Sequence, residues 1–329
     1  MRILLWHVHG GWSDAFVRGG HDYLIPRTPE GGAWGLGRGG RPWPDTAVEA
    51  APESLADAEI DVVVLQRPEE MDVAEELLGR RLARDVATVF LEHNTPKPAA
   101  VTTRHPLADR SDIGIVHVTH FNELVWDNGD APTVVVEHGI PDPGPLYSGE
   151  FERLAVVTNE PVRRGRITGT DLLPRFLAAG PLDVFGMGTD GVPAAIGTPD
   201  GDIDVLGDLP TARLHAELAR RRVYVHTARW TSLGLSLLEA MHLAMPVVAL
   251  DVTEAGRAVP PEAGAISTNV DELVHAARRL LSDPDEARRR GLVAREAALE
   301  RYGLDRFLRD WDEVLADATG TAIIGRNAT

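Results

Sequence analysis

The segment 230–250 holds the side chains whose types and spacing point most directly to a ligand. An apolar run comes before it, Gly234 interrupts it, a helical pattern begins at Leu235, and a Val-Val-Ala-Leu strand pattern ends it. The amino end of a helix after a strand attracts phosphate through unpaired N–H groups and the helix dipole. Glu239 comes soon after, and a carboxylate suits two vicinal hydroxyls because it only accepts hydrogen bonds. The segment therefore indicates nucleotide binding, with Glu239 on the ribose, unless Glu239 serves only the helix dipole.

Arginines are almost the only side chains that could bind a phosphate in this chain. Lys97 is its single lysine, so a guanidinium fork or backbone N–H groups must form any anion site. Arg163, Arg164 and Arg166 follow the strand pattern 154–158 and are candidate phosphate ligands. A solvated basic loop is the alternative interpretation.

A second glycine motif, from Gly186 to Gly191, fits the dinucleotide pattern G-x-G-x-x-G. That fingerprint requires a helix directly afterwards. Pro193 and Pro199 argue against such a helix, so a nicotinamide dehydrogenase is not favoured.

Short apolar runs alternating with longer segments predict two α/β halves with parallel sheets. The Gly/Trp/Pro-rich stretch 31–44 is expected to be an irregular loop, and the Pro/Gly-rich stretch 140–149 is expected to link two domains. The expected strands are 3–8, 61–66, 87–91, 114–119, 133–137, 154–158, 182–185, 203–206, 223–227 and 247–250. The expected helices are 171–179, 211–221, 235–243, 271–281, 285–300 and 304–316.

Composition excludes several classes of protein. The chain has 329 residues, a formal charge of −17 and no cysteine, which argues against disulfide scaffolds, thiol nucleophiles and broad nucleic-acid binding. No apolar run is long enough to span a bilayer, and the amino-terminal run is too short for a secretory signal. We therefore expect a cytoplasmic protein, with peripheral membrane contact through arginines left open.

Segment 230–250 resembles the carboxyl-terminal signature of the retaining GT-B glycosyltransferases of family 4, the glycosyl transferases group 1. That pattern is a Glu, seven residues, a second Glu, Ala-Met and a Gly-x-Pro-Val-Val-like strand; here Glu239 is the second Glu and Ala244 replaces the usual Gly. The resemblance covers roughly residues 1–315. It implies two facing Rossmann-like domains with an interdomain cleft: an acceptor domain at 1–145 and a donor domain at 146–329, with the last helix packing back on the first domain.

The same resemblance implies a carbohydrate-biosynthetic transferase that moves a hexosyl group from a UDP- or GDP-sugar to a sugar, lipid-linked or small-molecule hydroxyl. No metal or other cofactor is expected, and the oligomeric state stays open. The implied donor-binding residues are Gly10, Gly11, Arg164, Gly186, Gly207, Ser232, Leu233, Gly234, Leu235 and Glu239. The implied catalytic residues are His93, Arg163, Arg166 and Thr231, and Trp12, Asn94 and His138 are implied on the acceptor side.

Thr231 stands where the family has its first Glu. A threonine can hydrogen-bond a sugar hydroxyl, but it offers no negative charge to an oxocarbenium-like centre. Two alternatives therefore stay open, a nucleotide-sugar epimerase of the same architecture and a non-catalytic protein that binds sugar nucleotides.

Overall fold

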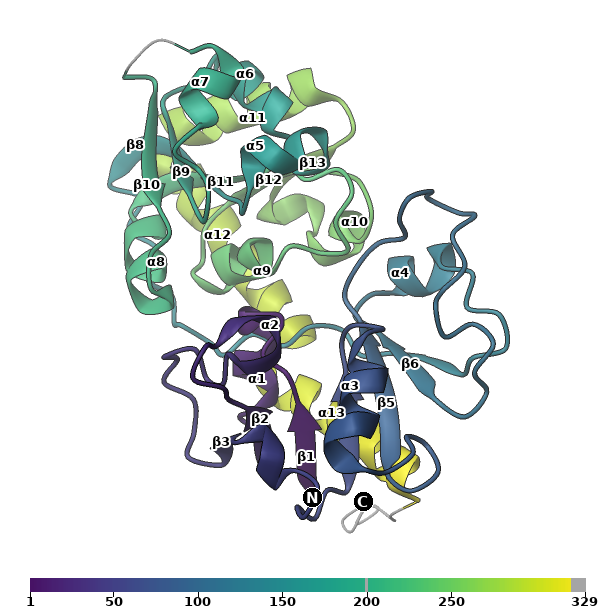
Figure 1. Ribbon diagram of the computed structural model, residues 1–329. Coiled ribbons are helices and arrows are strands. Elements are labelled where there is room, and N and C mark those ends of the chain that lie inside the picture. The colour runs from purple at the N-terminus through teal and green to yellow at the C-terminus, as the bar shows by residue number, and fades with distance from the viewer. Residues whose placement is uncertain (199–200, 321–329) are drawn as a thin grey trace, which may run out of the picture. The chain divides into compact units, whose positions relative to one another are not determined.

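The computed structural model describes residues 1–198 and 201–320 (Figure 1). The chain forms two compact units. The first consists of Met1–Pro141 together with the carboxyl-terminal segment from Leu304, and the second is Asp142–Gly303. Each unit has its own parallel sheet.

The sheet of the first unit has seven strands in the order β3-β2-β1-β4-β5-β6-β7, and all neighbouring strands are parallel. Its strands are β1 (Arg2–Leu5), β2 (Asp22–Pro26), β3 (Ala47–Ala50), β4 (Val62–Leu65), β5 (Ala87–Glu92), β6 (Gly114–His117) and β7 (Thr133–Val135). Its helices are α1 (Gly10–Phe16), α2 (Gly32–Gly35), η1 (Pro52–Ser54), α3 (Glu70–Leu78), α4 (His120–Val125) and α13 (Leu304–Thr319).

Helix α13 packs on the first unit because its apolar side chains recur every four residues. Phe307, Trp311 and Leu315 are buried in the same core as Ile3 and Trp12. In Figure 1 this yellow helix lies beside β5, which it contacts together with β4 and α1.

The second unit has a six-stranded parallel sheet in the order β10-β9-β8-β11-β12-β13. Its strands are β8 (Phe151–Val157), β9 (Leu182–Phe185), β10 (Ile203–Gly207), β11 (Arg221–His226), β12 (Val247–Leu250) and β13 (Gly264–Ser267). Its helices are α5 (Pro161–Arg164), η2 (Gly165–Ile167), η3 (Thr170–Leu172), α6 (Leu173–Phe176), α7 (Val192–Ile196), α8 (Thr211–Leu218), α9 (Leu235–His242), α10 (Ala255–Ala258), η4 (Pro261–Ala263), α11 (Val270–Ser282) and α12 (Pro284–Tyr302).

Both sheets reverse their strand order once, between β1 and β4 and between β8 and β11. Connections leave the two central strands on opposite sides at such a point, so ligands bind beyond the carboxyl ends of the strands. In each unit this edge is therefore where functional side chains are sought.

The structure corrects several sequence-based expectations. Strands β2, β3 and β13 were not predicted, and α2 forms one helical turn inside the stretch 31–44. Helix α7 does follow the Gly186–Gly191 motif, because Pro193 occupies its first turn, where no backbone N–H is needed. Helix α8 ends at Leu218, and the buried Arg221 begins β11, where it pairs with Asp183.

Ala244 adopts a left-handed conformation at φ 67° where helix α9 ends. The Met245 N–H closes the helix end on Ala240 O at 3.0 Å, an arrangement that favours glycine at position 244. Helix α12 packs against this turn so closely that a Cβ at Gly291 would lie 1.9 Å from Ala244 O. The replacement of the family's glycine therefore strains the backbone, in addition to any effect on packing.

We expect Ala244→Gly to raise the free energy of unfolding by about 1 kcal/mol, because glycine removes the left-handed strain. Urea denaturation measures the change. Ala297→Gly inside α12 is the matched control and should lower the same quantity by about 1 kcal/mol. A loss of stability in Ala244→Gly would contradict the interpretation of strain.

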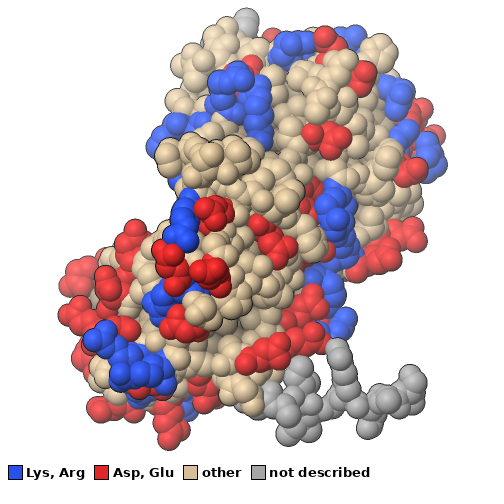
Figure 2. Space-filling model, turned by 90° about the vertical axis from the view of Figure 1, so that its right-hand side faces the viewer, with Lys and Arg blue, Asp and Glu red and all other residues tan. Residues whose placement is uncertain are grey.

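The visible surface carries interspersed charges. Figure 2 shows basic side chains in separate groups among acidic and uncharged ones. Within residues 1–198 and 201–320, no helix is both long enough and apolar enough to cross a membrane.

Candidate active site

Glu239 lies on α9, whose other side packs into the second unit through Leu237, Leu238 and Met241. Its side chain is only 17% exposed. The nearest basic group is His215 on α8, whose Nε2 lies 3.7 Å from Glu239 Oε1, beyond hydrogen-bonding distance. In the described part of the chain no donor hydrogen-bonds this carboxylate, and His215 Nε2 is buried without a partner. Both groups therefore have open hydrogen-bonding capacity.

The loop before α9 packs on the carboxyl end of β11. A Cβ at Gly234 would lie 2.5 Å from Cε1 of His226, so the loop can lie on this ring only with glycine there. Burial lowers the pKa of His226 to about 4, so the ring is neutral at pH 7. The other predicted donor residues of this loop are the partly exposed Thr231 and Leu235 and the buried Ser232 and Leu233.

The turns after β8, β9 and β10 meet at the same edge of the sheet. The Gly186 N–H donates to Gly207 O at 2.8 Å. Gly186 has φ +118°, and a Cβ there would lie 2.2 Å from Thr158 O, so this close approach requires glycine. The structure thus brings Gly186 and Gly207 together beside the end of β8.

The three arginines after β8 differ in their partners. Arg163 Nε lies 3.3 Å from Glu160 Oε2, and Arg166 Nη1 lies 2.8 Å from Asp171 Oδ2; both arginines are strongly exposed. Arg164 is partly buried, and no ion pair or hydrogen bond of its side chain occurs within the described residues. Burial, and then the charge of Arg163, lower the pKa of Arg164. The unpaired cation of this loop is therefore Arg164.

Arg229 was missed in the sequence, although it comes directly after β11 at the ligand edge. Its Nη1 and Nη2 donate to Asp171 Oδ1 and Oδ2 at 2.6 and 3.0 Å. This pairing is the largest cause of the lowered pKa of Asp171. Arg229 therefore ties the loop after β8 to the end of β11.

In the first unit, Gln66 orients the ring of His93. Gln66 Nε2 donates to Trp6 O at 2.7 Å, so its Oε1, 3.0 Å from His93 Nε2, must accept a hydrogen bond. His93 therefore carries its proton on Nε2, and Nδ1 is an acceptor. Within the described chain Nδ1 has no partner and is not fully enclosed. It is thus available to a ligand hydroxyl.

Glu70, the first residue of α3, fixes the backbone of Gln66 through a hydrogen bond. Its Oε2 accepts from the Gln66 backbone N–H at 2.5 Å, and its Oε1 accepts from Arg67 Nε at 2.8 Å. Burial raises the pKa of this carboxyl group, and the hydrogen bonds and Arg67 oppose the rise. The sequence signal for this pair is a polar Gln66 at the end of a predicted strand, with a Glu four residues later.

Three histidines gather at the carboxyl edge of this sheet. The rings of His9 and His93 lie 4.0 Å apart, and His138 lies close enough to lower the pKa of His93. Burial is the main cause of all three lowered pKa values, to about 4 for His9, about 3 for His138 and well below the usual range for His93. These imidazoles are therefore neutral at pH 7.

The other predicted acceptor residues occupy different environments. Trp12 is 1% exposed and stacks on Phe16 at 4.6 Å, so this ring supports the core and offers no face to a sugar, which corrects its predicted role. Asn94 is exposed, and its backbone O accepts from Trp126 Nε1 at 2.8 Å. Gly10 and Gly11 are the first two residues of α1.

We expect that His93 in Gln66→Leu is no longer restricted to the Nε2–H tautomer, because the variant lacks the Oε1 atom that accepts the Nε2 proton. Histidine ¹⁵N chemical shifts should then report a mixture of tautomers in place of one Nε2–H form. The ratio kcat/KM should fall about tenfold, the effect of losing one hydrogen bond. An unchanged Nε2–H signal in the folded variant would show that Gln66 does not set the tautomer.

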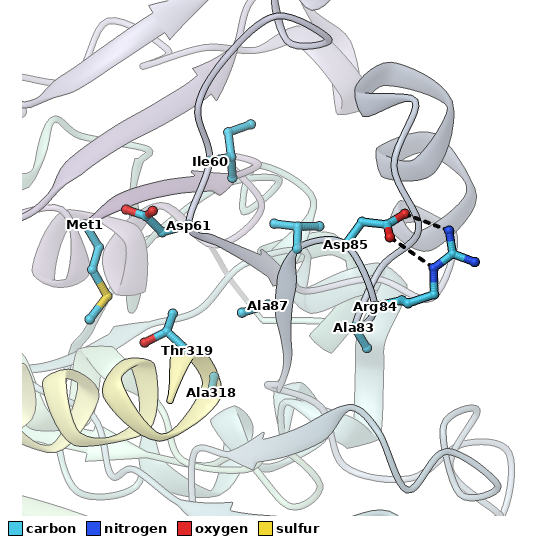
Figure 3. Close-up of a pocket in the computed structure, with 10 residues that line it drawn as sticks. Met1, Ile60, Asp61, Ala83, Arg84, Asp85, Ala87, Ala318 and Thr319 are labelled. Carbon is cyan, nitrogen blue, oxygen red and sulfur yellow. Dashed lines mark hydrogen bonds and ion pairs between the residues drawn. The ribbon is translucent and has the colours of Figure 1, made fainter. Parts of the chain in front are cut away.

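An open cavity of about 660 Å³ lies near the amino ends of β1, β4 and β5, away from the ligand edge (Figure 3). Arg84 and Asp85 at its rim pair with each other, Nε to Oδ1, at 3.0 Å. Asp61 accepts from the Arg2 N–H at 2.7 Å. The charged groups of this cavity thus have partners already, so the cavity is a weaker candidate for a ligand site than the carboxyl edges of the two sheets.

Across the described residues, no group of His, Asp and Glu side chains is arranged to hold a metal ion.

Comparison with known families gives one match. Residues 199–297 match the model of the glycosyl transferases group 1. This range contains Thr231, Glu239 and all of α9.

Solved glycosyltransferases share the fold. HepE from Anabaena, in complex with UDP-glucose, is 16% identical, with 96% of this chain and 100% of HepE covered and a TM-score of 0.73. Sucrose-phosphate synthase from Thermosynechococcus elongatus is 15% identical, with 97% and 99% covered and a TM-score of 0.70. TarM from S. aureus is 14% identical with a TM-score of 0.63; 77% of this chain is covered, and it spans only 55% of TarM.

The two Rossmann-like units have the GT-B fold of these structures. The likeness to the glycosyl transferases group 1 covers residues 199–297, which lie in the second unit.

Proposed function

We propose that the protein moves a hexosyl group from a nucleoside diphosphate sugar, UDP-linked in the first instance, to an acceptor hydroxyl with retention of configuration. The observation that carries the proposal is the Glu239 carboxylate, largely buried yet without a hydrogen-bond donor in the described chain. Such a group is costly unless a ligand supplies donors. The vicinal hydroxyls of a ribose supply two. HepE was solved with UDP-glucose and TarM with UDP, which supports a uridine donor.

In this proposal the second unit binds the donor. Glu239 accepts from the ribose hydroxyls, and Arg164 faces the diphosphate, where negative charge grows as the bond to the sugar C1 breaks. The acceptor oxygen forms the new bond to C1, and its proton passes to the departing diphosphate. Arginine and backbone N–H groups balance the charge, so no metal is required.

The first unit supplies acceptor-side groups in the same proposal. His93 Nδ1 accepts a hydrogen bond from a substrate hydroxyl, because Gln66 holds the proton on Nε2. The imidazole is neutral, so it orients the hydroxyl without placing a positive charge beside the reacting carbon.

Incubating the full chain with UDP- and GDP-hexoses and candidate acceptors, with and without EDTA, tests the proposal. We expect a glycoside with the anomeric configuration of the donor, seen in the ¹H coupling of the anomeric proton, and equal rates with EDTA. Inverted product would contradict retention. Loss of activity in EDTA would contradict the metal-free mechanism.

Thr231 favours one other candidate, a protein that binds sugar nucleotides without turnover. Comparing the native chain with Thr231→Glu separates the two functions. Sizeable native turnover dismisses the binding-only candidate, whereas turnover only in the variant supports it. Conversion of the donor sugar without acceptor would instead indicate an epimerase.

A further inference from the structure

Arg41 is a partly buried cation whose side chain has no partner in the described chain. Its guanidinium lies against Gly10, where a Cβ would be 2.3 Å from Nη2 and 2.6 Å from Cζ. No ion pair or hydrogen bond of this side chain occurs among residues 1–198 and 201–320, and its nitrogens are not fully enclosed. Most arginines of this acidic protein pair with carboxylates or carbonyl oxygens, so an open guanidinium at the ligand edge is notable.

The segment 31–44 that carries Arg41 is fixed on the sheet edge by several contacts. His7 Nδ1, at the end of β1, donates to Gly37 O at 3.0 Å. Arg67 Nη2, at the end of β4, donates to Ala33 O at 2.9 Å, and its guanidinium lies 4.1 Å from the Trp34 ring centre. The position of Arg41 is therefore set by both central strands of the unit.

The same edge carries the hydroxyl-accepting atom of the candidate site. Arg41 lies against Gly10, and the residue before Gly10 is His9. The ring centres of His9 and His93 lie 4.0 Å apart, and Nδ1 of His93 is accessible. Two other cations near the histidines already have partners: Arg67 pairs with Glu70, and Arg306 pairs with Asp310. A molecule that reaches both Arg41 and His93 would present an anion to the first and a hydroxyl to the second.

We propose that Arg41 binds a phosphate group on the acceptor, so that the acceptor is a phosphorylated sugar or another phosphate ester. A planar guanidinium with free donors matches phosphate oxygens in a bidentate manner. The identification of this phosphate ester as the acceptor substrate rests on the proposed function. The anion site itself does not depend on catalysis, and the donor diphosphate is the competing source of the same phosphate chemistry.

Calorimetric titration of the full chain with glucose, glucose 6-phosphate, fructose, fructose 6-phosphate, inorganic phosphate and UDP separates these sources. The variants are Arg41→Ala, Arg41→Lys and the control Arg309→Ala, which removes an exposed arginine of α13 in the same unit. We expect a hexose phosphate to bind more tightly than its hexose. Arg41→Ala should weaken that binding about 10- to 100-fold, Arg41→Lys less, and Arg309→Ala not at all.

UDP binding tells the outcomes apart. The proposal holds if UDP binds equally to the native chain and to Arg41→Ala while hexose-phosphate binding falls. It is overturned if UDP binding falls instead, if no hexose phosphate binds more tightly than its hexose, or if Arg41→Ala and Arg309→Ala behave alike. Failure of UDP to bind at all, with an Arg41-dependent hexose-phosphate site, would contradict the proposed donor and leave this inference standing.

Discussion

Glu239→Ala is expected to lower the affinity for UDP, and kcat/KM for the UDP-sugar, about 100-fold. Two hydrogen bonds to a charged acceptor are lost, and at about 1.5 kcal/mol each their combined loss of about 3 kcal/mol corresponds to roughly 100-fold. The carboxylate has no donor in the described chain, so its removal leaves no protein group newly unpaired. Calorimetry with UDP and initial rates at varied donor concentration measure the two quantities.

Glu296→Ala is the matched control, because Glu296 is exposed on α12 and has no ion pair in the part of the chain described. This variant should bind UDP like the native chain. Glu239→Gln should fall between the two, since an amide oxygen still accepts a hydrogen bond but carries no charge. Native-like UDP affinity in Glu239→Ala would contradict the ribose assignment.

Arg164→Ala is expected to lower kcat about 30- to 1,000-fold, the effect of removing about 2–4 kcal/mol of transition-state stabilisation. Its guanidinium is partly buried and unpaired in the described chain, so its donors are available to the diphosphate as charge develops. Arg163 and Arg166 are exposed and paired with carboxylates, so their alanine variants should change kcat by less than about threefold.

Initial rates at saturating donor, with circular dichroism melts to verify folding, test this ranking. A large loss of activity in Arg163→Ala or Arg166→Ala, with little change in Arg164→Ala, would contradict the assignment of Arg164. The diphosphate contact would then be assigned to Arg163 or Arg166, as predicted from the sequence.

Elements with strong local patterns could be predicted from the sequence. The strands at 182–185 and 247–250 have the predicted bounds, and α9 begins at Leu235 as expected. Buried parallel strands read as continuous apolar runs, and the helix begins after a glycine. Strands β2 and β3 were not predicted because Asp22–Pro26 contains a proline and Ala47–Ala50 a charged residue. Their conformation depends on tertiary pairing, of β2 with β1 and of β3 with β2.

The candidate site was predictable only where the residue type itself carries the chemistry. Glu239 and His93 were named from the sequence, but which arginine remains unpaired depends on distances to Glu160 and Asp171. Gln66 acts through the fixed direction of its amide, which depends on Trp6 O, 60 positions away. Such orientations arise from tertiary contacts that no local pattern encodes.

The most direct test of the central claim compares UDP with 2′,3′-dideoxy-UDP by calorimetry on the native chain and on Glu239→Ala. If Glu239 holds the ribose hydroxyls, the native chain binds UDP about 100-fold more tightly than the dideoxy analogue, and the variant binds both alike. Equal affinity of the native chain for the two nucleotides, or a preference for UDP that survives in Glu239→Ala, would contradict the claim.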